Sequence, residues 1–174
     1  MSCLVCQQIE KKIGILHETK DVIALIDPEP AVAGQLLVVP KKHHVILEQV
    51  PDWVMSQLFS VANKLSIALF EGLGAHGTNL LIPNGAPAGQ RVAHIGLHVV
   101  PRAENDGLNL QWDPRQLAED EMGTIEMKVK DELKSALTFE KSEPKPKEEV
   151  KEKKIEYRMS DEENYLIRSL QRIP

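Results

Sequence analysis

The stretch that decides the fold is residues 89–102, which read GQRVAHIGLHVVPR. Its many Val, Ile and Leu residues, followed by Pro101, predict a β-strand. Alternate residues of a strand share a face, so His94, Gly96 and His98 would point the same way. The two imidazoles would then stand about 13 Å apart, at roughly 3.3 Å of rise per residue. A helix would bring them close enough to share a metal, but Gly96, Pro101 and the β-branched residues argue against a helix.

The length and composition indicate a globular protein. The chain has 174 residues, which predicts one domain with an appendage. Hydrophobic residues make up 42% and charged residues 27% of it, the usual balance for a folded domain. No apolar run approaches the roughly 20 residues of a membrane span, and the N-terminal sequence does not read as a secretory signal, so we expect a cytoplasmic protein without membrane association. The net charge of −5 gives no support for general nucleic-acid binding.

The only two cysteines form a C-x-x-C pair, Cys3 and Cys6. In a reducing compartment such a pair is typical of a metal site or a redox pair rather than of a structural disulfide. A redox pair usually stands between a strand and a helix of a βαβ unit, whereas this pair stands ahead of the first predicted strand. The position favours metal binding.

Outside the histidine stretch the sequence predicts one long helix and several strands. The helix covers residues 52–70, where apolar residues repeat at helical spacing. The expected strands are residues 12–17, 22–27, 36–39 and 78–82, with the histidine stretch as the last. This order predicts an α+β fold with about five strands in a largely antiparallel sheet.

Residues 1–110 are the expected main domain, and residues 111–174 are the expected C-terminal extension. Within the extension, residues 114–137 have the apolar spacing of an amphipathic helix. Residues 140–154 form a Lys/Glu/Pro-rich linker with little to bury. Residues 160–172 begin with a capping box and predict a short helix, which would dock on the main domain or on a second subunit.

Several separated motifs between residues 3 and 102 resemble the histidine-triad (HIT) family. The family carries an H-x-H-x-H strand after a Gly-Gln turn, often followed by Pro-Arg, and His94 and His98 match its first and third histidines. The LLVVPKKH segment matches as well. Gly96 replaces the middle histidine, which is the nucleophile of the family. Gln35 stands where many members have a histidine, and this second departure favours natural divergence over an engineered change at residue 96.

The resemblance implies a zinc site. A subset of the family has an N-terminal C-x-x-C, and its zinc is also held by the histidine after the Pro-Lys turn and by the first triad histidine. The matching residues are Cys3, Cys6, His43 and His94, a donor set that suits tetrahedral structural zinc. The alternative is a free thiol pair beside two ordinary histidines. Family members are commonly homodimers, so a homodimer is implied too.

The resemblance also implies a pocket for a purine mononucleotide or nucleotide conjugate. Asn84 and Gln90 match amides that face the phosphate, and Asp27 matches the aspartate that binds the ribose hydroxyls. Backbone N–H groups in the turn of residues 84–90 are candidates for an anion nest. Arg91 replaces a common Ser or Thr, and its guanidinium points either at the phosphate or into solvent.

The implied catalysis lacks its nucleophile. In the family, the middle histidine attacks the α-phosphorus and forms a nucleotidyl-histidine that water resolves, but Gly96 offers no lone pair. His98 is left as a phosphate contact or an acid. The sequence therefore supports two hypotheses: a nucleotidyl hydrolase or phosphoramidase of altered or reduced activity, and a non-catalytic nucleotide sensor or zinc-stabilised interaction module.

Overall fold

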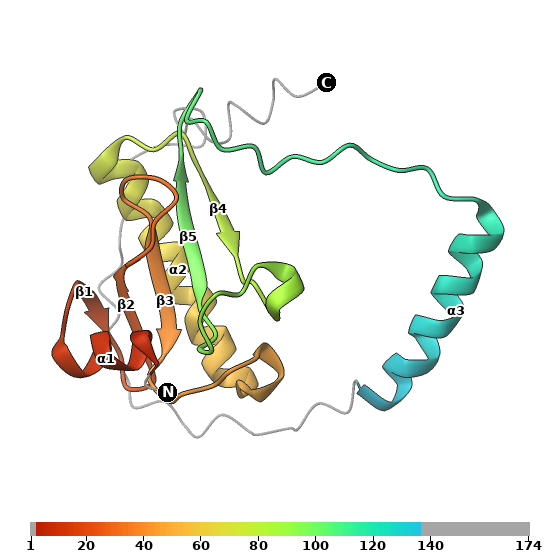
Figure 1. The fold of residues 1–174 in the computed structure, drawn as a ribbon, viewed down its shortest axis with the longest axis horizontal. Coiled ribbons are helices and arrows are strands. Elements are labelled where there is room, and N and C mark those ends of the chain that lie inside the picture. The colour runs from red at the N-terminus through yellow and green to blue at the C-terminus, as the bar shows by residue number, and fades with distance from the viewer. Residues whose placement is uncertain (1–2, 137–174) are drawn as a thin grey trace, which may run out of the picture. The chain divides into compact units, whose positions relative to one another are not determined.

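The computed structural model describes residues 3–136, and its main element is a five-stranded sheet (Figure 1). The strands are β1 (Ile15–Glu18), β2 (Val22–Ile26), β3 (Leu36–Pro40), β4 (Gly77–Leu81) and β5 (Leu97–Arg102). Their order is β1-β2-β3-β5-β4, and every neighbouring pair is antiparallel. This confirms the predicted α+β fold with its five-stranded sheet and long helix.

The long helix, α2 (Asp52–Leu73), packs on one face of the sheet (Figure 1). Its buried residues, among them Leu58 and Ala62, form the larger core cluster with the sheet residues that point toward the helix. Gly74 ends the helix with a φ of 65°, a left-handed conformation that glycine adopts without a steric penalty. The helix extends about one turn past residue 70, where the sequence predicts its end.

The opposite face of the sheet carries a smaller core under the N-terminal helix, α1 (Leu4–Lys11). Val5 of α1 is buried there against Leu37 and Val39 of β3. The helix ends in a cap at Lys12, whose backbone is left-handed with a φ of 53°. Strand β1 consequently begins at Ile15 rather than at residue 12.

The predicted strand through the histidine stretch is wrong in its first half. Strand β5 begins at Leu97, and residues 91–96 form no regular strand. The Ile95 N–H donates to the carbonyl of His44, 2.8 Å away, so this part of the chain bonds to a loop instead of to a neighbouring strand. His94 therefore precedes the strand on which His98 lies, and the strict alternation predicted for the two histidines does not apply.

The end of β5 is fixed by the side chain of Arg102. Its Nε and Nη2 donate to the two carboxylate oxygens of Asp106 at 2.6 and 2.9 Å, and its Nη1 donates to Asn79 on β4 at 2.7 Å. The bidentate ion pair holds the pKa of Asp106 well below its usual range. Arg102 therefore anchors the turn after β5 to the edge of the sheet.

After Leu108 the chain enters a second unit, whose described part contains the helix α3 (Glu119–Ala136). This helix starts five residues later than the predicted one, within an otherwise matching range. The predicted linker over 140–154 and the predicted helix over 160–172 lie outside the described residues. The division into domains 1–110 and 111–174 stays a prediction. Among the described helices, none combines the length and the apolar character needed to cross a bilayer.

Candidate functional site

Four potential metal ligands from three parts of the chain meet beside α1. Cys3 caps the helix and Cys6 lies one turn later, so the two sulfurs lie on one side of it. His43 follows β3 and His94 precedes β5. The ligand atoms of the four residues all lie within 4.8 Å of one another. The structure thus brings together the four residues that the sequence pointed to, and the cluster could hold a metal ion.

The spacing of the cluster fits a zinc-sized ion. Cys6 Sγ lies 3.3 Å from His43 Nδ1 and 3.5 Å from His94 Nδ1, and Cys3 Sγ lies 3.6 Å from His94 Nδ1. A tetrahedron with Zn–S bonds of about 2.3 Å and Zn–N bonds of about 2.0 Å separates sulfur and nitrogen ligands by about 3.5 Å. His94 Nε2 donates to the Pro40 carbonyl at 2.9 Å, which leaves the lone pair on Nδ1, directed at the sulfurs.

The protonation of the cluster also suits a cation. Burial lowers the pKa of His94, so its imidazole is neutral, as a metal ligand must be. Burial, followed by the neighbouring Cys3 thiol, raises the pKa of Cys6 to about 11. Two thiols this close cannot both ionise easily on their own. A bound divalent cation would supply the positive charge that two thiolates need.

His43 rather than His44 joins the cluster. The two rings of His43 and His94 meet edge to face, with their centroids 5.1 Å apart. His44 is buried, and burial lowers its pKa. Its backbone carbonyl accepts the Ile95 N–H, so His44 lies where the loop after β3 contacts the chain that precedes β5.

The space beside Gly96, which the resemblance aligns with the family nucleophile, is filled by the protein itself. Gly96 is buried, and a Cβ added there would lie 2.7 Å from Leu37 Cδ1 and 3.2 Å from Val39 Cγ1. Both contacts come from β3, the strand next to β5. Gly96 therefore does not open a hollow at this point of the sheet, because a leucine methyl group already occupies it.

His98 forms a short hydrogen bond with a buried carboxylate. Its Nδ1 lies 2.6 Å from Asp27 Oδ2, and Asp27 is only 4% exposed. Gln35 Nε2 donates to the same oxygen at 2.6 Å, while Gln35 Oε1 accepts the Ala31 N–H at 2.8 Å. The Glu29 N–H donates to Asp27 Oδ1 at 3.0 Å. We call these three residues, Asp27, Gln35 and His98, the carboxylate–imidazole cluster. The cluster links the end of β2 to the beginnings of β3 and β5.

The carboxylate–imidazole cluster keeps Asp27 ionised. Burial by itself would raise the pKa of this carboxyl, but the hydrogen bonds from His98, the Glu29 N–H and Gln35 together hold the pKa below its ordinary value. An ionised carboxylate only accepts hydrogen bonds, so His98 Nδ1 must be the donor. The tautomer with the hydrogen on Nδ1 carries its lone pair on Nε2.

The two amide side chains expected at the phosphate make hydrogen bonds between loops. Asn84 accepts the Leu47 N–H at 3.0 Å and donates to Glu48 at 2.9 Å. Gln90 accepts the Gly85 N–H at 2.8 Å and donates to the Val45 carbonyl at 2.6 Å. Both residues therefore join the 83–90 loop to the segment that leads into α2.

Four backbone N–H groups of the predicted anion nest already donate hydrogen bonds within their own loop. The N–H groups of Gly85, Ala88, Gly89 and Gln90 already donate to acceptors between residues 85 and 90. The next side chain, Arg91, is exposed. The Arg91 guanidinium is therefore available to an anion at the end of this loop, whereas the four backbone N–H groups are already hydrogen-bonded.

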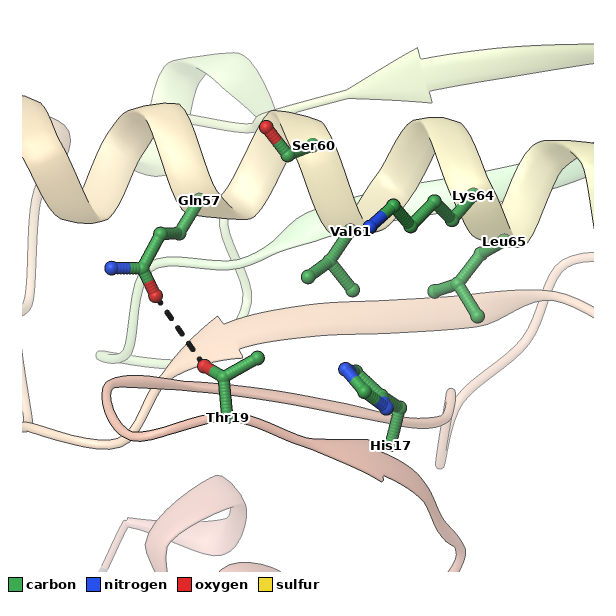
Figure 2. A pocket seen from close by; sticks show the side chains of 7 residues that line it. All are labelled: His17, Thr19, Gln57, Ser60, Val61, Lys64 and Leu65. Carbon is green, nitrogen blue, oxygen red and sulfur yellow. Dashed lines mark hydrogen bonds between the residues drawn. The ribbon is translucent and has the colours of Figure 1, made fainter. Parts of the chain in front are cut away.

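A shallow groove on the other side of the sheet lies apart from all these residues. Figure 2 shows His17 and Thr19 of the β1–β2 hairpin facing Gln57 and Lys64 of α2 across it. His17 pairs with Ala24, which belongs to the core under α2, so the groove lies on the helix side of the sheet. None of the predicted site residues lines it.

The sequence reasoning missed the role of Gln35 and Leu37. Gln35 was visible as a departure from the family pattern, but only the fold shows that its amide bonds to Asp27. Leu37 gave no signal, because in the sequence it is one of four consecutive apolar strand residues.

Comparisons with known proteins agree with the fold and the cluster. The HIT-domain family model matches residues 8–105 of the chain. A HIT-like protein of Methanocaldococcus jannaschii is 35% identical over 107 residues, which cover 60% of this chain and 82% of the relative. An adenosine 5′-monophosphoramidase of Candida albicans is 32% identical over 142 residues, which cover 76% of this chain and 91% of the relative.

One of the similar solved structures is zinc-bound. The zinc-bound histidine triad family protein of Mycobacterium smegmatis superimposes with a TM-score of 0.59 at 33% sequence identity. The match covers 78% of this chain and 98% of that protein. The similarity therefore extends over nearly the whole of a zinc-containing relative.

Proposed function

The chain belongs to the HIT family, and from this premise we propose that it binds a purine mononucleotide or nucleotide conjugate and hydrolyses it at the α-phosphate with reduced activity. The observation that carries the proposal is the short contact between His98 and Asp27 beside Gly96. It keeps one imidazole with an available nitrogen next to the place where the nucleophile is missing. The named activity of the Candida relative supports a phosphoramidate or related nucleotide conjugate as substrate.

In this proposal the other matched residues bind or frame the nucleotide. Arg91 supplies a positive charge to the phosphate. Asn84 and Gln90 shape the loop around it through the bonds they make to neighbouring backbone. Asp27 is nearly buried and accepts three hydrogen bonds, so it has little capacity left for ribose hydroxyls.

The test combines binding and turnover. Calorimetry with AMP is expected to show saturable binding that weakens in an Arg91→Ala variant. Adenosine 5′-phosphoramidate is expected to be hydrolysed faster by the parent than by His98→Ala. Lys64→Ala, which lies in the groove on the helix side, serves as the control and is expected to match the parent. A parent that binds no AMP would contradict the proposal and leave a purely structural zinc protein.

A non-catalytic nucleotide sensor is the second candidate. It is favoured because Gly96 has no reactive side chain and the apolar side chain of Leu37 occupies the space beside it. A protein of this kind would bind AMP with the same dependence on Arg91 but would not exceed the hydrolysis rate of His98→Ala. Turnover, rather than affinity, separates the two candidates.

We also propose that Cys3, Cys6, His43 and His94 hold structural zinc, with the protein in the cytoplasm. The S/N donor set, its spacing and the neutral His94 support zinc. A zinc site that uses two thiolates suits a reducing compartment. Zinc at this place would tie α1 to the segments before β5 and after β3, and its role is to hold the fold together.

A homodimer completes the proposal. Strand β4 is an outer strand of the sheet, and an outer strand offers unpaired backbone groups to another strand. Leu80 of β4 is 40% exposed, and Phe59 on α2 is 46% exposed. Leu80 pairs with Val99, so it lies on the helix side of the sheet. A second copy of the chain would cover apolar surface of this kind.

A further inference from the structure

His98 lies two residues beyond the position of the missing nucleophile. Gly96 directly precedes β5, and two residues of extended chain span about 6.6 Å. Direct attack on phosphorus needs the reacting atoms about 3 to 3.5 Å apart and in line. A nucleotide placed for a nucleophile at residue 96 would therefore lie beyond direct reach of His98, but within reach through one water molecule.

The contacts of His98 are those of a base rather than of a free surface histidine. Its Nδ1–H is held at 2.6 Å by a buried carboxylate, which fixes the ring orientation and leaves the lone pair on Nε2. The same carboxylate would stabilise the imidazolium that forms when Nε2 takes a proton. Gln35 holds the shared oxygen of Asp27 in place at 2.6 Å.

We propose that Asp27 and Gln35 position His98 as a general base that activates water, so that hydrolysis is a single displacement without a nucleotidyl-histidine. The inference rests on the proposed hydrolase function. The water oxygen forms a bond to the α-phosphorus while its proton passes to His98 Nε2. The bond from phosphorus to the leaving group breaks, and the leaving group departs with the electron pair. It then takes the proton from His98, so the products are a nucleoside monophosphate and the protonated leaving group.

In this assignment Asp27 is a positioning residue that acts through His98. It differs from the role that the family resemblance implies, in which this aspartate binds the ribose. The two roles predict different kinetic effects. Loss of a ribose contact weakens nucleotide affinity, whereas loss of a positioning carboxylate lowers kcat.

The first test is the stereochemical course at phosphorus. The intact protein hydrolyses an adenosine 5′-phosphorothioate ester of defined configuration in oxygen-labelled water. A single displacement inverts the configuration, which is the expected result. Retention would require two displacements, with a covalent intermediate, and would overturn the inference while leaving the hydrolase function in place.

The second test is the Asp27→Asn variant, which keeps the size of the side chain. We expect kcat to fall by about 100-fold or more and the affinity for AMP to change by less than about threefold. Asp52→Asn makes the same chemical change at an exposed position, the first residue of α2, and is the matched control. A loss of AMP affinity with unchanged kcat would overturn the inference in favour of a ribose contact.

The third test needs no turnover. Nitrogen NMR of the histidine rings is expected to show His98 protonated at Nδ1 and unprotonated at Nε2, with a mixture of tautomers in Asp27→Asn. The opposite tautomer in the parent would overturn the inference. Absence of AMP binding would instead overturn the proposed function itself. AMP binding with hydrolysis no faster than in His98→Ala would overturn the general-base role and favour the sensor.

Discussion

At the scale of single residues, Leu37 determines how much room there is for a side chain at residue 96. A histidine at residue 96, as the family resemblance would place it, needs room for a side chain, but Leu37 Cδ1 lies 2.7 Å from where its Cβ would be. Restoring the histidine therefore requires Leu37 to change its rotamer within a buried cluster that includes Val39 and Leu25. Packing around residue 96 is thus adapted to glycine.

Replacing Gly96 with histidine is expected to destabilise the protein. Overpacking of this kind costs about 1 to 3 kcal/mol, which urea denaturation would measure as a lower midpoint. The double variant Gly96→His with Leu37→Ala is expected to lose less than the sum of its two single variants, because the shortened side chain makes the room that the imidazole needs. If the double variant loses as much stability as the two single variants together, the two positions do not share this space.

Removing the charge of Asp27 is expected to change the acid stability. The pKa of Asp27 is lowered in the fold, so its stabilising contribution is complete above the unfolded pKa of about 3.9 and is lost as the pH falls through the folded pKa. Asp27→Asn is expected to cost about 1.5 to 3 kcal/mol at neutral pH. The difference from the parent should shrink below about pH 4, as followed by urea denaturation across pH. A difference that is constant across pH would contradict the ionic origin of the effect.

At the scale of elements, α2 and the sheet carry the larger core. Leu58 is 1% exposed and belongs to the cluster that joins the helix to β2, β3 and β5. Leu73, at the end of the same helix, is 63% exposed. The helix therefore contributes to stability mainly through its central turns.

The same substitution at the two positions tests this difference. Leu58→Ala is expected to lower the free energy of unfolding by about 2 to 5 kcal/mol, because it leaves a cavity in the core. Leu73→Ala is expected to cost about 0.5 kcal/mol or less. Urea denaturation of both variants measures the difference, and equal losses would mean that the packing along α2 is uniform.

At the scale of the whole molecule, the Cys/His cluster joins parts of the chain that are up to 91 residues apart. A metal held by all four residues would bind the folded chain more tightly than the unfolded one, so it would stabilise the fold by mass action. Outer strand β4 is a second feature at this scale, because it is the strand that the proposed homodimer would cover.

Metal removal is expected to lower the thermal midpoint. At a free zinc concentration 100 times the dissociation constant the ion contributes about 2.7 kcal/mol, so chelation should lower Tm by roughly 5 to 10 °C. The purified protein is expected to carry one zinc per chain, measured by atomic emission. The Cys3→Ser, Cys6→Ser double variant is expected to bind no zinc and to show the lower Tm with or without chelator. A parent whose Tm does not respond to chelation would contradict a structural zinc.

The proposed dimer is tested by a substitution on outer strand β4. Light scattering is expected to give the mass of two chains for the parent and a shift toward one chain for Leu80→Lys, because a charge at the contact is costly to bury. Leu16→Lys makes the same change on β1, the opposite outer strand, where Leu16 is 51% exposed, and is expected to stay dimeric. A monomeric parent would rule out the proposed dimer.

The sequence by itself determined the order and type of the main elements. Alternating and continuous apolar patterns are local properties, so they placed four of the five strands and α2 to within a few residues, while the histidine strand was predicted to begin too early. The chemistry of Cys3, Cys6, His43 and His94 was also readable, although their convergence came from the family resemblance, since spacing along a chain does not give distances in space.

The tertiary structure alone decided where the histidine strand begins and what surrounds its residues. The Ile95 N–H bonds to the His44 carbonyl instead of to a strand partner, and this long-range choice ends the β pattern early. It also decided that Leu37 fills the space above Gly96 and that Asp27 bonds to His98. Such contacts depend on how three strands align in register, which is set by packing of the whole sheet and not by any one segment.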